Sequence, residues 1–115
     1  MTIILSGQEA AFNTDILANT RLQTVPSAGV LLFELQASDN DATNNFTASI
    51  QLPGGDTPME LVRVPCGNST GLAGVLDDRT KLMASFRVAQ GGHTVFSCVE
   101  TGDAELTWRV TFTPV

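Results

Sequence analysis

The sequence is divided into short runs in which apolar and polar residues alternate. The clearest run lies near the C-terminus, where single polar residues separate four apolar ones: Leu106, Trp108, Val110 and Phe112. Similar runs occupy residues 31–37, 46–52 and 59–64. Alternation with a period of two places one set of side chains on each face of a β-strand. The pattern therefore predicts strands that recur about every ten to fifteen residues, with Gly, Pro, Asn and Asp between them.

This strand spacing is typical of an all-β fold. We expect an antiparallel β-sandwich, jelly-roll-like, with about seven to eight strands; an immunoglobulin-like sandwich and a closed barrel are the alternatives. A chain of 115 residues has the size of one domain, and we place the sandwich at residues 21–115. Residues 1–20 are expected to form an N-terminal arm or a short helix, because Ser6 and Glu9 have the spacing of a capping box.

The adjacent glycines Gly91 and Gly92 separate two strand-like runs, residues 80–90 and 93–99. Two glycines in this position predict a tight hairpin turn with positive φ. Such a turn would pair the two strands directly and place Val88 opposite Val95.

The hairpin register divides the side chains of these two strands between two faces. One face is apolar and is expected to line the core: Leu82, Ala84, Phe86, Val88, Val95 and Val99. The opposite face carries apolar residues where polar ones are expected, so that either a partner covers this face, or a bulge or longer loop turns Phe96 inward. Under the first interpretation, the candidate interface residues are Met83, Arg87, Phe96 and Cys98, joined by Phe12 of the arm.

The charge of the chain argues against several classes of partner. Its net charge is −6, with only six Lys and Arg residues, whereas nucleic-acid binding requires a basic patch. The same acidity disfavours an anionic membrane surface, and no apolar segment approaches the length of about 20 residues that crosses a bilayer. The first residues lack the basic region of a signal peptide, so we expect synthesis in a cytoplasm.

Side chains that usually carry catalysis are scarce. The chain has fourteen threonines but a single lysine, Lys81, a single histidine, His93, and no tyrosine. Catalysis by His93 would require a nucleophile and an orienting carboxylate beside it, and a polar residue flanking a turn is the simpler interpretation. The neighbouring carboxylates Asp77 and Asp78, and those between residues 100 and 105, lie in turn-like sequence and are expected to be solvated. We therefore expect that the protein is not an enzyme.

No metal or cofactor site is predicted. Asp39 and Asp41 lie in an oxygen-rich run, residues 38–45, which makes them weak calcium candidates, but the glycine and the bidentate glutamate of an EF-hand loop are missing. Two cysteines, Cys66 and Cys98, with one histidine fall short of the ligands of a zinc site. Free thiols are expected for them in a cytoplasmic protein, with one disulfide as the alternative.

The strand-rich pattern, the low lysine content and the acidic charge together resemble small β-sandwich virion proteins of tailed bacteriophages, such as capsid decoration (cement) proteins. The resemblance lies in composition and pattern over the whole chain, so it carries no family residues onto particular positions. It implies a structural protein of the virion, made in the host cytoplasm. It also implies a homo-oligomer, with a trimer favoured, that docks on a larger protein shell, often through N-terminal arms.

A monomeric binding module of the jelly-roll type, for carbohydrate or peptide, is the alternative function. Such sites usually present exposed aromatic side chains. With six Phe, one Trp and no Tyr, the chain has few aromatic residues beyond those that the core requires.

Overall fold

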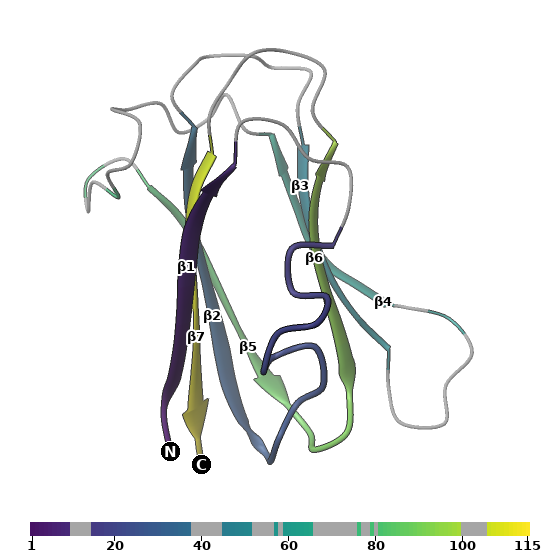
Figure 1. Ribbon diagram of the computed structural model, residues 1–115. Coiled ribbons are helices and arrows are strands. Elements are labelled where there is room, and N and C mark those ends of the chain that lie inside the picture. Colours follow the sequence, from purple (N-terminus) through teal and green to yellow (C-terminus); the bar gives the residue numbers. More distant parts are fainter. Residues whose placement is uncertain are drawn as a thin grey trace.

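In the computed structural model the chain forms a sandwich of two antiparallel β-sheets (Figure 1). The structure describes residues 1–9, 15–37, 45–51, 57, 59–65, 76, 79, 81–99 and 106–115, and these contain seven strands and no helix. The strands are β1 (Ile3–Glu9), β2 (Gly29–Ala37), β3 (Asn45–Gln51), β4 (Met59–Pro65), β5 (Leu82–Val88), β6 (His93–Val99) and β7 (Leu106–Pro114). The predicted all-β sandwich is confirmed.

Strands from distant parts of the chain are neighbours in each sheet. One sheet has four strands in the order β1-β7-β2-β5, and the other has three in the order β4-β3-β6. Every pairing between these strands is antiparallel. The chain therefore crosses repeatedly from one sheet to the other, and the first and last strands are paired. No helix long and apolar enough to cross a bilayer occurs in the part of the chain that is described.

The alternating runs place their apolar residues between the sheets. On β7 the side chains of Trp108, Val110 and Phe112 are buried, as the sequence predicts. In register with them, β2 contributes three more buried side chains: Leu35, Phe33 and Leu31. Burial of large apolar side chains stabilises a fold by about 1.5–3 kcal/mol each.

Aromatic rings join the two sheets at the centre of the core. Phe33 of β2 stacks on Phe96 of β6, with ring centroids 5.0 Å apart, and Phe96 also lies 6.3 Å from Trp108. The ring of Phe86 on β5 meets Phe33 edge-on at 6.4 Å. Because Phe96 belongs to the three-stranded sheet and its neighbours to the four-stranded sheet, this cluster holds the sandwich together.

The stretch for which an arm or a short helix is expected begins with a strand. Residues Ile3–Glu9 are strand β1, which pairs with β7 along its whole length, and residues 10–14 lie outside the described residues. Pairing with β7 overrides the local capping signal at Ser6, as tertiary contacts often override propensity. Gly7 is required here, because a Cβ atom at this position would lie 2.9 Å from the indole of Trp108. Phe12 lies outside the described residues.

The expected hairpin at Gly91 and Gly92 is wrong. Strands β5 and β6, which flank the glycines, belong to different sheets and do not pair with each other. Gly91 has the predicted positive φ of 87°, but the turn pairs with Val25 instead. The Gly91 amide donates to the Val25 carbonyl at 2.9 Å, and the Val25 amide donates to the Gly92 carbonyl at 2.8 Å. The glycines therefore carry the chain from one sheet to the other.

An irregular segment, residues 15–25, covers the outer edge of β6 (Figure 1). The Ile16 amide donates to the Phe96 carbonyl, and the Thr94 amide donates to the Gln23 carbonyl, both at 2.9 Å. A carboxylate oxygen of Asp15 accepts from the Phe96 amide, also at 2.9 Å. Three apolar side chains of the segment are fully buried in the core: Leu17, Leu22 and Val25.

Candidate functional site

The side of the four-stranded sheet that faces away from the sandwich carries an unusual mixture of side chains. We call it the outer sheet face, and its members on β1, β7, β2 and β5 are Ile4, Ser6, Gln8, Thr107, Arg109, Thr111, Leu32, Glu34, Gln36, Met83, Ser85 and Arg87. At the middle of the sheet, Glu34 stands opposite Arg109 on one side and Met83 on the other. Glu34 and Gln36 are almost completely buried, although they point away from the core.

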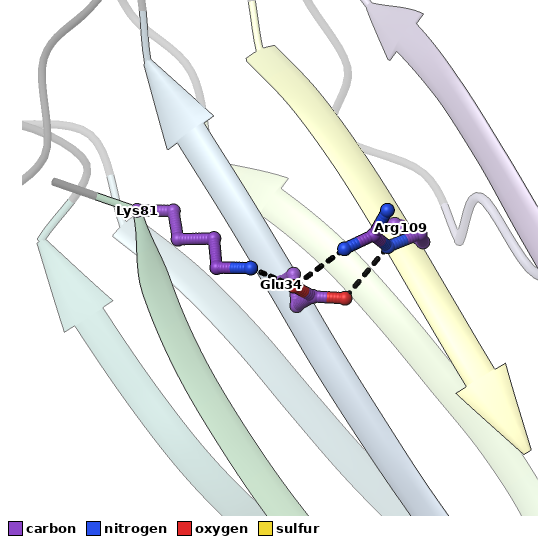
Figure 2. A network of polar contacts seen from close by, with 3 residues as sticks. All are labelled: Glu34, Lys81 and Arg109. Carbon is purple, nitrogen blue, oxygen red and sulfur yellow. Dashed lines mark hydrogen bonds and ion pairs between the residues drawn. The ribbon is translucent and has the colours of Figure 1, made fainter. Parts of the chain in front are cut away.

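Glu34 is held by two cations from neighbouring parts of the sheet (Figure 2). The Arg109 guanidinium donates two hydrogen bonds to it, from Nε to Oε1 at 2.7 Å and from Nη2 to Oε2 at 2.8 Å. The ammonium of Lys81, immediately before β5, donates to Oε2. This bidentate arrangement is the strongest geometry that an arginine and a carboxylate can adopt.

The two cations keep the Glu34 carboxylate ionised. Hydrogen bonds from the Arg109 guanidinium lower the pKa of Glu34 from 4.5 to about 2, with Lys81 adding to the effect, although burial acts to raise it. Burial of a charged group is tolerated when the group is paired and hydrogen-bonded, as it is here. The cluster thus joins β7, β2 and the start of β5 across the outer sheet face.

The arrangement has the properties of a structural clamp. Both oxygens of the Glu34 carboxylate accept hydrogen bonds from cations, and its low pKa makes it a poor general base at neutral pH. Lys81, the single lysine of the chain, forms an ion pair in the same cluster. These contacts join three strands, and they do not make Glu34 a reactive group.

A hollow lies beside the cluster, at the paired ends of β1 and β7. Its volume is about 600 Å³, and it is lined by Ser6, Gly7, Gln8, Leu76, Thr107, Trp108 and Arg109. The indole nitrogen of Trp108 is buried and has no hydrogen-bond partner among the described residues. The lining is mixed, with hydroxyl, amide and guanidinium groups beside apolar carbon.

The predicted interface residues do not lie on one surface. Met83 and Arg87 are exposed on the outer sheet face, whereas Phe96 is only 1% exposed and lies in the core. Of the two interpretations of Phe96, the outer-face placement beside Met83 is therefore wrong and the inward one is correct. The cause is that β6 joins the other sheet, not a bulge or a longer loop. Cys98 is on β6, but its side chain, like Phe12, lies outside what the structure describes.

Most of the other candidate residues lie in segments outside the described part of the chain. The calcium candidates Asp39 and Asp41, and likewise Asp77, Asp78 and Cys66, lie outside the described residues. His93 is partly buried at the start of β6, where its backbone pairs with Thr24 in a single antiparallel β-bridge. Within the described ranges, no three His, Cys, Asp or Glu side chains gather into a possible metal site.

The Glu34 cluster was not predicted from the sequence. Its one visible signal is a carboxylate inside an apolar run, since Glu34 lies between Phe33 and Leu35. A strand that is buried on both faces requires partners for such a residue. The partners themselves are 47 and 75 residues away along the chain, so only the fold identifies them.

Comparison with known proteins gives a likeness of fold only. No protein-family model matches the sequence, and no curated protein matches it either. The structure is similar to a chain in a structure described as "Acidic stable capsid structure of Helicobacter pylori bacteriophage KHP30", with a TM-score of 0.53 and 12% sequence identity. The match covers 99% of this chain and 89% of the other, so the two chains have similar lengths and are alike over nearly their whole extent.

Proposed function

We propose that this chain is a structural protein of a bacteriophage virion. The observation that carries the proposal is the similarity of its fold, over 99% of its length, to a chain of a bacteriophage capsid structure. The sequence pattern supports the same class of protein independently, through its strand-rich, lysine-poor and acidic character. Virion location, after synthesis in the host cytoplasm, is part of the proposal.

Within that class, we propose a decoration (cement) role, in which copies of the chain associate symmetrically and dock on a larger protein shell. The jelly roll that the sequence predicts belongs to this proposal. A jelly roll has eight strands in two sheets. The observed strand order supports this fold when segment 15–25, which lies beside β6, is counted as the eighth strand.

The proposed role is mechanical and not catalytic. Among the described residues, the principal charged cluster is the closed Glu34 clamp, whose carboxylate is saturated by Arg109 and Lys81. A rigid sandwich with its central strands fixed on both faces suits a protein that works by its shape.

The test is to look for the protein in particles and then to measure binding. Mass spectrometry of purified virions from the source should detect the chain in a fixed ratio to the main shell protein. Purified chain should then bind shells that lack it, measured by cosedimentation. Absence from virions together with no binding to shells would overturn the proposal.

The alternative is a monomeric module that binds carbohydrate or peptide. The hollow beside Trp108 and Arg109 is the feature that favours it. A glycan array and a peptide array test this alternative, and a specific ligand bound by a monomer would support it. We favour the virion role because the described aromatic side chains of Phe33, Phe96, Trp108 and Phe112 are buried and offer no stacking platform.

A further inference from the structure

The edge strands of the two sheets differ in how they are protected. The four-stranded sheet ends in β1 and β5, and the three-stranded sheet ends in β4 and β6. An edge strand presents unpaired amide and carbonyl groups to which another strand can add, and proteins block such edges with charges, prolines, bulges or covering segments. These devices can be compared edge by edge.

Both edges of the three-stranded sheet carry such devices. Segment 15–25 hydrogen-bonds along β6 and occupies its edge. The pairing of β4 with β3 is broken by a register shift at Ala48 and Ser49. In addition, β4 contains Glu60 and Arg63 and ends at Pro65. Neither strand offers a regular, uncharged edge to a partner.

The two edges of the four-stranded sheet differ from each other. Strand β5 carries the exposed Arg87, so pairing β5 with a second β5 would bring two arginines onto one seam. Strand β1 pairs with β7 in an unbroken register over seven residues and has no charged side chain and no proline before Glu9. Among the described residues, no segment pairs with the outer edge of β1. Ile4, on the outer sheet face of this strand, is 58% exposed.

We propose that β1 pairs antiparallel with β1 of a second copy of the chain, about a two-fold axis. The inference rests on the proposed function, because it supplies the contact for the self-association proposed there. The second copy is the partner because its described strands offer the same single unguarded edge, and an edge that pairs with itself forms an isologous contact. The strand is also uncharged through residue 8, so two acidic copies do not repel each other along this seam.

The sequence of β1 indicates the register of the contact. Placing Ile4 opposite Ile4 of the second copy brings Ile3 opposite Leu5. In that register core-facing residues meet core-facing residues, and apolar side chains meet apolar side chains. The two four-stranded sheets become one continuous sheet. The contact is two-fold, so it predicts an even number of copies in place of the trimer that the sequence resemblance favours.

A matched pair of lysine substitutions tests the contact. Met83 has the same 58% exposure as Ile4 and lies on the same outer sheet face, but on β5. We expect wild type to sediment as a dimer, Ile4→Lys to weaken the dimer about ten-fold or more because it places like charges opposite each other, and Met83→Lys to leave it unchanged. A monomeric or trimeric wild type overturns the proposal, and so does equal weakening by both substitutions. Circular dichroism confirms that both variants are folded.

A cysteine at the axis tests the register. In the proposed contact the two Cβ atoms at position 4 are about 4.5–5.5 Å apart, which a disulfide can bridge with a small adjustment. Ile4→Cys should therefore form a covalent dimer under mild oxidation, faster than Met83→Cys and faster than wild type, whose own cysteines set the background. No excess of covalent dimer from Ile4→Cys overturns this register.

The failure of this contact is distinguishable from failure of the proposed function. If virions contain the protein and shells bind Ile4→Lys as tightly as wild type, while wild type is monomeric in solution, the virion role stands and the β1 contact is wrong. If wild type is a β1-linked dimer that is absent from virions, the contact stands and the virion role is wrong.

Discussion

Phe33 and Glu34 are neighbours in the chain, lie on the same strand, and are each only 2% exposed, yet they are buried by different physics. Phe33 points between the sheets, where it stacks on Phe96. Glu34 points to the outer sheet face, where Arg109 and Lys81 enclose its carboxylate. Burial on β2 is therefore apolar on one face and depends on charge pairing on the other.

Truncating a side chain on the core-facing side of β2 is expected to lower the free energy of unfolding more than removing the Glu34 carboxylate. Phe33→Ala should lower the free energy of unfolding by about 3–5 kcal/mol, because it removes the stacking ring and leaves a cavity in the core. Urea unfolding of wild type and variant measures the difference. Leu32→Ala on the opposite face of the same strand, where the side chain is only partly buried, is the control. An equal loss for both would show that the aromatic cluster has no special role.

Removing the carboxylate on the other side should have a somewhat smaller effect. Glu34→Ala removes the carboxylate that binds both Arg109 and Lys81, and should lower the free energy of unfolding by about 2–3 kcal/mol. This is below the range of about 3–5 kcal/mol for fully buried pairs, because the Arg109 side chain is 41% exposed. Combining Glu34→Met with Lys81→Met should restore part of the loss, since the Lys81 ammonium, whose side chain is only 8% exposed, is then removed together with the carboxylate that it binds. If the double variant is less stable than Glu34→Ala, the clamp is stabilising in its own right.

The ionised Glu34 cluster should also make the free energy of unfolding depend on pH in the acid range. The aromatic core should not contribute to this dependence. The pKa of Glu34 in the folded protein is about 2, below the ordinary value of 4.5, so its contribution is present above pH 4.5 and is lost as the pH falls through 2. The difference in unfolding free energy between wild type and Glu34→Gln should therefore shrink over that range. The corresponding difference for Phe33→Ala should not follow the titration of Glu34. A wild-type to Glu34→Gln difference that is constant with pH would contradict the ionised clamp.

The smallest effect is expected at Met83, the residue opposite Glu34 on β5. Met83→Ser should change the free energy of unfolding by less than about 0.5 kcal/mol, because the side chain is exposed and no described contact depends on it. Thermal melts of the two proteins measure this. A larger loss would mean that Met83 shields the clamp from water and belongs to the buried side of the comparison.

Much of the fold could be predicted because alternation is a local property. The runs around Phe33, Ile50 and Trp108 became strands, and the side chains of Trp108, Val110 and Phe112 face the core as expected. For the strand at Ile3–Glu9 the sequence left an arm and a short helix open, because the capping-box spacing at Ser6 and Glu9 is also a local signal. Pairing with β7, about a hundred residues away in the sequence, decided its conformation.

The candidate site was less predictable than the fold. Met83 and Arg87 were expected on an exposed face, and they are exposed. For Phe96 the assumed hairpin left an outer-face and an inward placement open. The hairpin could not decide between them, because assigning a strand to the wrong partner can exchange its inner and outer faces. Leu17 and Leu22 are buried in an irregular segment, and its sequence has no periodic pattern from which their burial could be predicted.

The sequence pattern was sufficient to predict that this chain is made of strands with one apolar and one polar face, because side-chain alternation follows from backbone geometry alone. It also set the chemical inventory, in which the single lysine and the carboxylate of Glu34 inside an apolar run were already visible. The sheet that each strand joins is known from the fold alone, and with it the burial of Phe96 in the core and the contacts of Glu34 with Lys81 and Arg109. Those outcomes depend on contacts between residues far apart in the chain, which no local pattern can specify.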